Sequence, residues 1–518
     1  MSTTDYCQSW YILGCAPVAA LLLNLWARLF NPWFGVDAFR HLMTAAEARR
    51  LNKFPTKSSP EFLFAGIYDY PPTVAYLASL FPRWFDKYFQ MLFSPMVEAL
   101  NLAFLGATLF LLGYNPILII KTQFLVMVIP AAVIDYSQYS SRGAGYFLFN
   151  LLVYGLILFA ATGAAVWLLT GAVAFLLIVY THKMAHQVAI LFLPLWALTT
   201  QSFWPILLLA VGETVAFLIN PTRYRWILKG HLQVLDYFRR NISFRYEPQF
   251  LGKSGIVSKD MMYYLKLIIR KAPIITILSA NLLVVMPVIL LFADVQQGGP
   301  SVLLVPAWKS WALLLLGIAL VTAYFRPLLW LGDGYKYVVY LSVPAAVLTV
   351  QYIETISRVR PGVVYGLVLA VLLIQSLYLQ YSIVVKDRGR SLSRELAEVF
   401  GFLKPDSGKI RLATFPLHLS EITAYFTGVR TLSTDSASVY VSGGDFEKFF
   451  PSIRRPFSYF ADKYQISHLL LQKKVFDFDD TGLDPRHWEK VFDSEGYEIF
   501  STVQSPRRTQ TELRADAP

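Results

Sequence analysis

Long apolar runs separated by short polar turns fill the chain from residue 11 to residue 385 and then stop. A helix needs about 17 to 25 mainly apolar residues to cross the hydrocarbon of a bilayer. The pattern therefore predicts an all-α polytopic membrane domain over residues 1–385. Its expected transmembrane helices, about eleven, lie near residues 11–30, 91–113, 115–134, 145–160, 164–180, 187–201, 203–220, 272–292, 308–328, 337–355 and 362–384.

Three polar stretches are too long to be turns: residues 31–90, residues 220–271 and the tail after Val385. The other connections are short, so neighbouring helices form antiparallel hairpins and the chain alternates between the two faces of the membrane. Two expected spans separate each of several segments from the next, so these segments fall on one face, namely residues 31–90, 135–145, 181–187, 220–271, 331–336 and the tail. We expect the chemistry to lie where these segments converge.

The tail, residues 386–518, has the pattern of a small soluble α/β domain. Helical periodicity covers residues 393–403 and 417–426, and apolar strands are predicted at residues 410–414 and 467–472. The second strand follows a helical stretch and is apolar in its centre, which indicates a buried parallel strand. No spacing typical of catalytic or metal-binding residues occurs in the tail.

The composition agrees with a membrane domain followed by a soluble tail, and it narrows the classes of binding partner. Hydrophobic residues make up 55% of the 518 and charged residues only 15%. The two cysteines, Cys7 and Cys15, exclude a disulfide framework, a cysteine zinc site and an iron–sulfur cluster. The tail carries 19 basic and 19 acidic residues, so the net charge of +12 belongs to the membrane part. This placement argues against a nucleic-acid partner and favours anionic membrane lipids or a lipid phosphate.

Two signals bear on orientation, and they oppose each other. Residues 222–271 contain eleven Lys and Arg against three Asp and Glu, which the positive-inside rule would place in the cytoplasm. That rule weakens for long loops, and a basic loop that binds a phosphate-bearing lipid has a reason to lie outside. The first apolar run has no basic segment before it and no cleavage site after it. We therefore expect a retained first helix in a prokaryotic inner (plasma) membrane, with the N-terminus in the cytoplasm and the tail outside.

The first long loop offers a carboxylate and an imidazole. Asp37 precedes a helix-forming run, where a short side-chain oxygen can cap the helix, and capping alone would explain it. His41 lies four residues later and so on the same helical face, which would place a base beside a proton or phosphate partner. Further along, Tyr70 precedes Pro71 and Pro72, a segment that a rigid turn would also explain.

A second acid, Asp135, ends an apolar run and is followed by hydroxyl side chains and Arg142. Placing a carboxylate at the bilayer centre costs about 2.5–3.5 kcal/mol, so Asp135 should lie at a helix end or face a wet cavity. Either location would let it act together with Asp37. Inside the expected spans, Glu98 and Glu213 could be functional or simply paired and buried.

Two short connections carry cations. His182 and Lys183 lie between two apolar helices and could face an anion, although basic residues also end transmembrane helices by snorkelling. Asp333, Tyr335 and Lys336 form a similar polar island, in which two glycines would let the backbone approach a ligand.

The order and spacing of these motifs over residues 11–385 resemble the GT-C superfamily of membrane glycosyltransferases, of the protein O-mannosyltransferase and aminoarabinose transferase type. These enzymes use polyprenyl-phosphate or polyprenyl-diphosphate sugars. The matching elements are the acidic first loop with Asp37 and His41, the Tyr70-Pro71-Pro72 segment, the second acid Asp135, the Thr181-His182-Lys183 turn and the stretch from Gly332 to Tyr337. The basic loop, with residues 232–245 helical, resembles the large external loop of this superfamily.

The resemblance implies transfer of a sugar from a polyprenyl-phosphate-linked donor to a lipid, glycan or protein acceptor, with inversion at the anomeric carbon. Asp37 would be the general base and Asp135 a second acid that orients the acceptor or a metal. The groups expected to bind the donor phosphate or the substrate are His41, Tyr70, Arg142, His182, Lys183, Asp333, Tyr335 and Lys336. Ala38 and Phe39 follow Asp37 where metal-dependent members have paired acids. No cofactor is therefore certain, and a divalent metal held by Asp37 and Asp135 stays an open alternative.

Two other functions are alternatives to the transferase. A transporter or flippase for a lipid-linked glycan or another anion would show Gly- or Pro-interrupted helices at matching positions in two repeats, and the sequence has no such symmetry. A noncatalytic scaffold in envelope assembly is the third. The gathering of polar residues in loops on one face favours the transferase.

Overall fold

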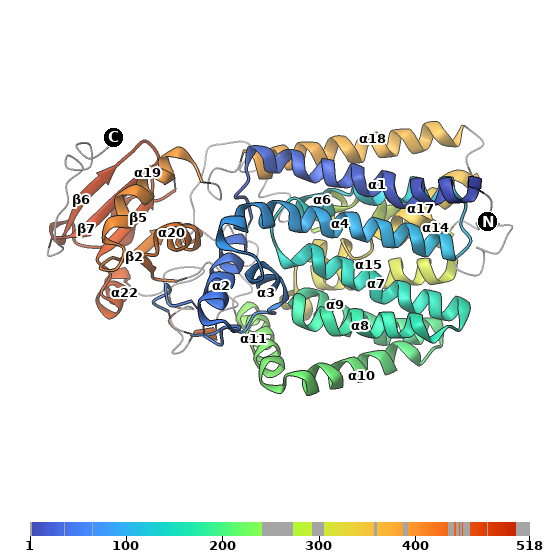
Figure 1. Ribbon diagram of the computed structural model, residues 1–518, viewed down its shortest axis with the longest axis horizontal. Helices are drawn as coiled ribbons and strands as arrows, with labels where there is room; N and C mark the ends of the chain where they lie inside the picture. Colours follow the sequence, from blue (N-terminus) through green and yellow to red (C-terminus); the bar gives the residue numbers. More distant parts are fainter. Residues whose placement is uncertain are drawn as a thin grey trace.

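The structure is a computed structural model that describes residues 3–35, 37–57, 59–64, 66–240, 273–292, 305–356, 360–386, 392–433, 440–441, 445, 448, 456–473 and 475–503. Most of this part is helical, and a small sheet lies near the C-terminus. Figure 1 shows a bundle of long helices at one end of the molecule and the sheet at the other. The helices α2, α3 and α11 lie between them.

Each apolar stretch expected to be helical is helical in the structure. The bundle contains α1 (Thr3–Phe30), α4 (Asp86–Leu111), α5 (Pro116–Met127), α6 (Pro130–Tyr136), α7 (Ser141–Thr162), α8 (Ala165–Thr181), α9 (Lys183–Thr200), α10 (Trp204–Ile219), α13 (Pro273–Ala280), α14 (Val285–Phe292), α15 (Val305–Tyr324), α16 (Gly334–Val338), α17 (Ser342–Ile356) and α18 (Pro361–Leu379). Among the described residues, four helices are long and apolar enough to cross a membrane, or up to seven if each bent pair is one span. The expected number of eleven spans stays a prediction.

Two of the expected spans are broken helices. α5 and α6 meet at 69°, because Pro130 begins α6 and cannot continue the hydrogen bonding of α5. α13 and the following helix meet at 109°, where the Asn281 side chain accepts a hydrogen bond from the Leu283 N–H at 3.0 Å. Hydrophobicity does not reveal these breaks, because the residues on both sides of them are apolar.

The basic loop begins with a helix, α11 (Pro221–Arg240), that turns away from α10 by 118°. It starts earlier than the expected helix at residues 232–245, since Pro221 lies at its first position, where proline is favoured. Residues 241–245 of the expected helix lie outside the described residues.

A mixed sheet with the strand order β3-β2-β5-β7-β6 lies near the C-terminus. Its elements are β2 (Arg411–Phe415), β3 (Arg430–Thr431), β5 (His468–Gln472), β6 (Trp488–Asp493) and β7 (Tyr497–Thr502), with the helices α19 (Arg394–Leu403), α20 (Leu419–Thr427) and α22 (Phe457–Tyr464). β2 and β5 pair in parallel, with Leu412 opposite His468. Leu412, Leu470 and Ile499 are buried together with Leu396 of α19. The helices and strands expected in the tail are thus confirmed, and so is the parallel strand.

The first long loop joins this sheet. Its elements are α2 (Ala38–Leu51), β1 (Gly66–Ile67) and α3 (Thr73–Ser79). The backbone N–H groups of Leu63 and Phe64 donate to the carbonyl oxygens of Thr431 and Leu432 at 2.8 and 2.9 Å. β1 pairs with β4 (Tyr440–Val441) in antiparallel fashion. The loop expected to carry the chemistry is therefore held by the tail as well as by the bundle.

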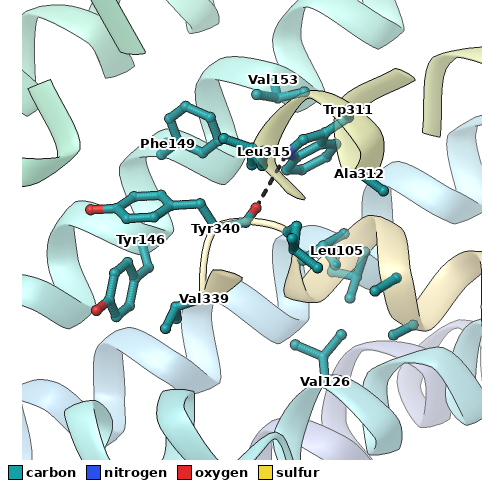
Figure 2. Packing of buried hydrophobic residues seen from close by; sticks show 14 of the residues in the cluster. Leu105, Val126, Tyr146, Phe149, Val153, Trp311, Ala312, Leu315, Val339 and Tyr340 are labelled. Atoms are coloured by element: carbon teal, nitrogen blue, oxygen red, sulfur yellow. Dashed lines mark hydrogen bonds between the residues drawn. The ribbon is translucent and has the colours of Figure 1, made fainter. Parts of the chain in front are cut away.

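Buried aromatic side chains pack together in the core of the bundle (Figure 2). The indole N–H of Trp311 donates to the carbonyl oxygen of Tyr340 at 3.2 Å. The ring centroids of Phe149 and Tyr146 lie 5.1 and 4.8 Å from that of Tyr340, both edge-on. Because Tyr146 is packed in this core and also reaches the cavity described next, the core fixes the position of its hydroxyl.

Candidate functional site

Segments distant in the sequence surround a cavity of about 680 Å³. Its walls come from the first loop, α6 and the start of α7, the start of α9, α11, α13 and the turn before α16. The expected site residues on its lining are Asp37, Tyr70, Asp135, Arg142, His182, Lys183, Asp333, Tyr335 and Lys336, and His41 is not among the lining residues. The expectation that the first loop and the later turns converge therefore agrees with the structure.

Asp37 lies directly before α2, but its side chain makes no capping hydrogen bond. Burial raises the pKa of its carboxyl, whereas nearby positive groups lower it, and the net pKa is below the ordinary value of 3.8. The groups that lower it are Arg142, His41, Arg40 and His182. Capping therefore does not explain Asp37, which presents an ionised carboxylate to the cavity at neutral pH.

Asp135 lies at the end of α6 and also faces the cavity. Its carboxylate accepts hydrogen bonds from Gln138 at 2.9 Å, from Arg142 at 3.3 Å and from the Tyr146 hydroxyl. With both oxygens engaged, Asp135 is suited to orienting Arg142 and is a poor candidate for taking a proton.

Lys183 is buried and paired, which contradicts the snorkelling explanation. Its ammonium donates to Asp69 at 3.1 Å and lies 5.6 Å from the centroid of the Tyr70 ring. The Tyr70 and Ser141 hydroxyls are 2.9 Å apart. The charge of Lys183 is thus already balanced by the carboxylate of Asp69, which precedes Tyr70 in the chain.

The two histidines differ from expectation, because both are neutral at neutral pH. Burial lowers the pKa of His182 to about 3, and its Nδ1 accepts a hydrogen bond from the Ala185 N–H at 3.3 Å, which caps α9. Burial lowers the pKa of His41 to about 4. The His41 ring lies edge-on to Tyr70 and Tyr139, with centroids 5.6 and 5.7 Å away. Neither imidazole supplies the positive charge that was expected to meet a phosphate.

The two glycines near Lys336 differ, because Gly332 lines the cavity and Gly334 does not. Lys336 and Asp333 form an ion pair at 2.9 Å. Gly332 has φ +138°, a conformation that other residues rarely adopt. A Cβ at Gly334 would lie 2.4 Å from the Ala319 carbonyl oxygen, so this glycine allows α16 to pack against α15. The expectation that Gly334 lets the backbone approach a ligand is therefore wrong.

A divalent metal on Asp37 and Asp135 does not fit this arrangement. Arg142 is ion-paired with Asp135 and acts electrostatically on Asp37, so its guanidinium already offsets the negative charge of both carboxylates. A metal would have to displace the hydrogen bonds on Asp135. Within the described residues, no three His, Cys, Asp or Glu are grouped so that they could hold a metal ion. The positive charge beside the two acids comes from Arg142.

The two acids expected inside the spans are paired. Glu98 is fully buried and accepts a hydrogen bond from Asn24. Glu213 lies 2.6 Å from the His186 ring and accepts from the Tyr224 hydroxyl at 2.8 Å. Neither is among the residues that line the cavity.

Sequence reasoning missed several polar groups at the site. Gln138 and Tyr146 hold Asp135, Asp69 holds Lys183, and Arg40 lies 4.6 Å from the centroid of the Tyr70 ring. Arg40 was visible as a cation three residues after Asp37. No local pattern marks Tyr146, because it stands in an apolar helix whose tyrosines look alike in sequence.

No protein-family model matches the chain, and no curated protein matches it by sequence. Solved structures do match. The oligosaccharyltransferase from Archaeoglobus fulgidus, in complex with Zn and sulfate, has a TM-score of 0.53 and 10% identity over 94% of this chain and 73% of that chain. The oligosaccharyltransferase AglB from the same organism, with an inhibitory peptide and a dolichol-phosphate, has a TM-score of 0.51 and 11% identity over 100% and 75% of the two chains.

ArnT from Cupriavidus metallidurans, bound to undecaprenyl phosphate, has a TM-score of 0.51 and 12% identity over 98% of this chain and 100% of that chain. These proteins are GT-C superfamily glycosyltransferases. The chain therefore has the GT-C fold and, with its long apolar helices, is an integral membrane protein.

Proposed function

We propose that the protein is a glycosyltransferase that moves a sugar from a polyprenyl-phosphate-linked donor to a lipid, glycan or protein acceptor. The single observation that carries the proposal is a cavity whose lining combines the ionised Asp37 with the cations Arg142, Lys183 and Lys336. This transfer requires a base that takes up the proton of the acceptor and cations that bind the phosphate of the donor.

Asp37 is the proposed general base. The nucleophilic atom of the acceptor attacks the anomeric carbon of the donor sugar and gives its proton to the Asp37 carboxylate. The bond between that carbon and the phosphate oxygen breaks on the opposite face, and the lipid phosphate leaves with the bonding electron pair. Attack and departure on opposite faces invert the anomeric carbon.

Arg142 and Lys336 are the proposed phosphate ligands. Both are partly exposed at the cavity, where Asp135 and Asp333 hold them. Cations fixed before the reaction stabilise the negative charge that builds on the leaving phosphate. Lys183 adds to the local charge from a buried position, where Asp69 keeps it in place.

An apolar wall supports a lipid-linked donor. Val234, Leu235 and Phe238 of α11 line the cavity together with Leu379, the last residue of α18, and Ile383, which follows that helix. Such a surface suits an isoprenoid chain, while the polar side suits its phosphate and sugar. The structures of similar fold that contain dolichol-phosphate and undecaprenyl phosphate support the same class of lipid.

The decisive variant is Asp37→Asn, which keeps the shape of the side chain and removes the base. Sugar transfer from undecaprenyl-phosphate-linked donors in membrane vesicles should fall by about 10²–10⁴-fold, the usual contribution of a general base. Binding of undecaprenyl phosphate by the purified protein should persist. Glu47→Gln is the matched control, because Glu47 lies on α2, which Asp37 precedes, and pairs with the exposed Arg50. Near-normal transfer by Asp37→Asn would refute the assignment.

The outer-face placement in the inner membrane needs a separate test. A cysteine introduced at Glu489, which is exposed on β6, would be treated with a membrane-impermeant maleimide in intact spheroplasts after Cys7 and Cys15 are replaced. Labelling is expected if the tail lies outside. Labelling only after lysis would reverse the proposed orientation.

A further inference from the structure

An arginine in the last turn of α1 bonds to the segment that precedes Asp37. Arg28 is 0% exposed, and a guanidinium withdrawn from water needs acceptors within the protein. It donates to the carbonyl oxygens of Phe34 and, at 2.8 Å, of Pro32. Both belong to the α1–α2 turn, residues 31–35, and Phe34 lines the cavity. A buried charge of the bundle is thus bonded directly to a wall of the site.

Other contacts hold the two sides of this junction. Arg28 also donates to the Gln90 carbonyl oxygen of α4 at 3.3 Å, so it joins the α1–α2 turn to a second bundle helix. A Cβ at Gly35 would lie 2.7 Å from the Cβ of Ala38, the first residue of α2, and 3.1 Å from the Tyr139 carbonyl oxygen. The turn is therefore packed tightly against the start of α2.

The contact uses a property that distinguishes arginine from lysine. A guanidinium presents five N–H donors in a planar fork and can reach several carbonyl oxygens at once, whereas a lysine ammonium is a compact point charge. The carbonyl oxygens of the α1–α2 turn follow the end of α1, where the helix no longer supplies donors. Arg28 provides donors for two of them, and it thereby fixes the backbone on which the position of Asp37 depends.

We propose that Arg28 is a positioning residue for Asp37, acting through the backbone of the α1–α2 turn. The inference rests on the proposed function, in which Asp37 takes the proton of the acceptor. The proposed phosphate ligands Arg142 and Lys336 lie on other segments, α7 and α16. Loss of the Arg28 contacts should therefore slow the transfer and leave the binding of the lipid phosphate unchanged.

The test compares Arg28→Gln and Arg28→Lys with the wild type in the full chain, reconstituted in lipid nanodiscs. The first readout is hydrogen–deuterium exchange of the amides of residues 31–41, which does not depend on any activity. The second is the affinity for undecaprenyl phosphate, and the third is kcat for transfer from undecaprenyl-phosphate-linked donors. Arg411→Gln is the matched control, because Arg411 donates to the carbonyl oxygen of Tyr464 at 3.1 Å within the tail.

In Arg28→Gln, the amides of residues 31–41 should exchange about 10-fold faster, because the hydrogen bonds that hold the turn are lost. The value of kcat should fall about 100-fold, the usual cost of displacing a reacting group by about 1 Å. Arg28→Lys keeps the charge without the fork and should also lose at least about 10-fold in kcat. The affinity for undecaprenyl phosphate should stay within about 2-fold of the wild type, as should all three readouts in Arg411→Gln.

A double variant separates positioning from general damage to the fold. Asp37→Asn already lacks the base, so adding Arg28→Gln to it should lower transfer by no more than about 2-fold. A full further loss would overturn the inference, because Arg28 would then act independently of Asp37. Unchanged exchange and kcat in Arg28→Gln would also overturn it, as would equal losses of kcat and of undecaprenyl phosphate affinity.

If neither Arg28 variant folds, Gly35→Ala decides, because its Cβ would disturb the same turn from the side of α2. A lower kcat with retained undecaprenyl phosphate affinity supports the inference, and an unchanged kcat overturns it. If the wild type transfers no sugar while Arg28→Gln still accelerates exchange in residues 31–41, the proposed function fails. The role of Arg28 in holding the segment before Asp37 then stands.

Discussion

Two lysine–aspartate pairs flank the same cavity, and they are held in different ways. The side chains of Lys183 and Asp69 are 8% and 4% exposed, and the two residues are far apart in the sequence. Those of Lys336 and Asp333 are 39% and 26% exposed and lie within one helical turn. The chemistry of the two pairs is the same, but their surroundings differ.

Burial decides what each pair can do. Breaking a buried pair leaves a charge without water or partner, whereas an exposed pair can exchange one partner for another at little cost. Lys336 can therefore turn from Asp333 to a substrate phosphate. Lys183 is bound to Asp69 beneath α11 and serves to fix the cavity wall while adding positive charge to it.

The strongest test of this contrast removes the carboxylate of each pair. Asp69→Asn should lower the free energy of unfolding by about 3–5 kcal/mol, because Lys183 is left buried and unpaired. Asp333→Asn should change it by about 0–1 kcal/mol, since water replaces the lost partner. Thermal unfolding of the purified variants measures both. Similar losses in the two variants would contradict the distinction.

The packing of α11 against Asp69 provides the second test. A Cβ at Gly230 would collide with the Asp69 carboxylate. Gly230→Ala should therefore destabilise the protein by about 1–3 kcal/mol through overpacking. Gly317→Ala is the control, because no atom lies within 4 Å of a Cβ there, and its helical position predicts a gain of up to about 1 kcal/mol. If Gly230→Ala leaves the stability unchanged, α11 does not pack tightly on the Lys183–Asp69 pair.

The third test asks which lysine meets the phosphate. Lys336→Gln should weaken binding of undecaprenyl phosphate by about 10-fold, the loss of roughly one charge-assisted hydrogen bond, without a loss of stability. Lys336→Arg should retain most of the affinity. Measurements at two salt concentrations should show a smaller difference between wild type and Lys336→Gln at high salt. Unaltered affinity in Lys336→Gln would remove Lys336 from the proposed site.

The smallest expected effect is a shift in pH dependence. Burial raises the pKa of Asp37 and Arg142 lowers it, so Arg142→Gln leaves the effect of burial less opposed. The carboxylate then takes up its proton at a higher pH, and the acidic limb of the kcat/KM profile should move to higher pH. Arg142→Lys keeps a positive charge and should leave the limb near its original position. A downward shift in Arg142→Gln would contradict the assignment of Asp37 as base.

Most of the helices lie where the sequence predicts them, and all of the expected site residues except His41 line the cavity, because both predictions depend on local patterns. Apolar length marks a membrane helix, and a polar cluster between two such helices lies at a membrane face. The partners of those residues were not predictable in the same way. Asp69 and Lys183 are 114 positions apart, and no local pattern links them.

The hydrophobic and polar pattern alone predicts a chain that crosses a membrane, an α/β tail, and a common location for Asp37, Asp135 and the later cations, which line one cavity. Tertiary structure alone decided which of these side chains are charged and what each one touches. Burial made His41 and His182 neutral, and long-range packing placed Asp69 beside Lys183. The physical reason is that desolvation and pairing depend on neighbours in space, whereas hydrophobic periodicity depends on neighbours along the chain.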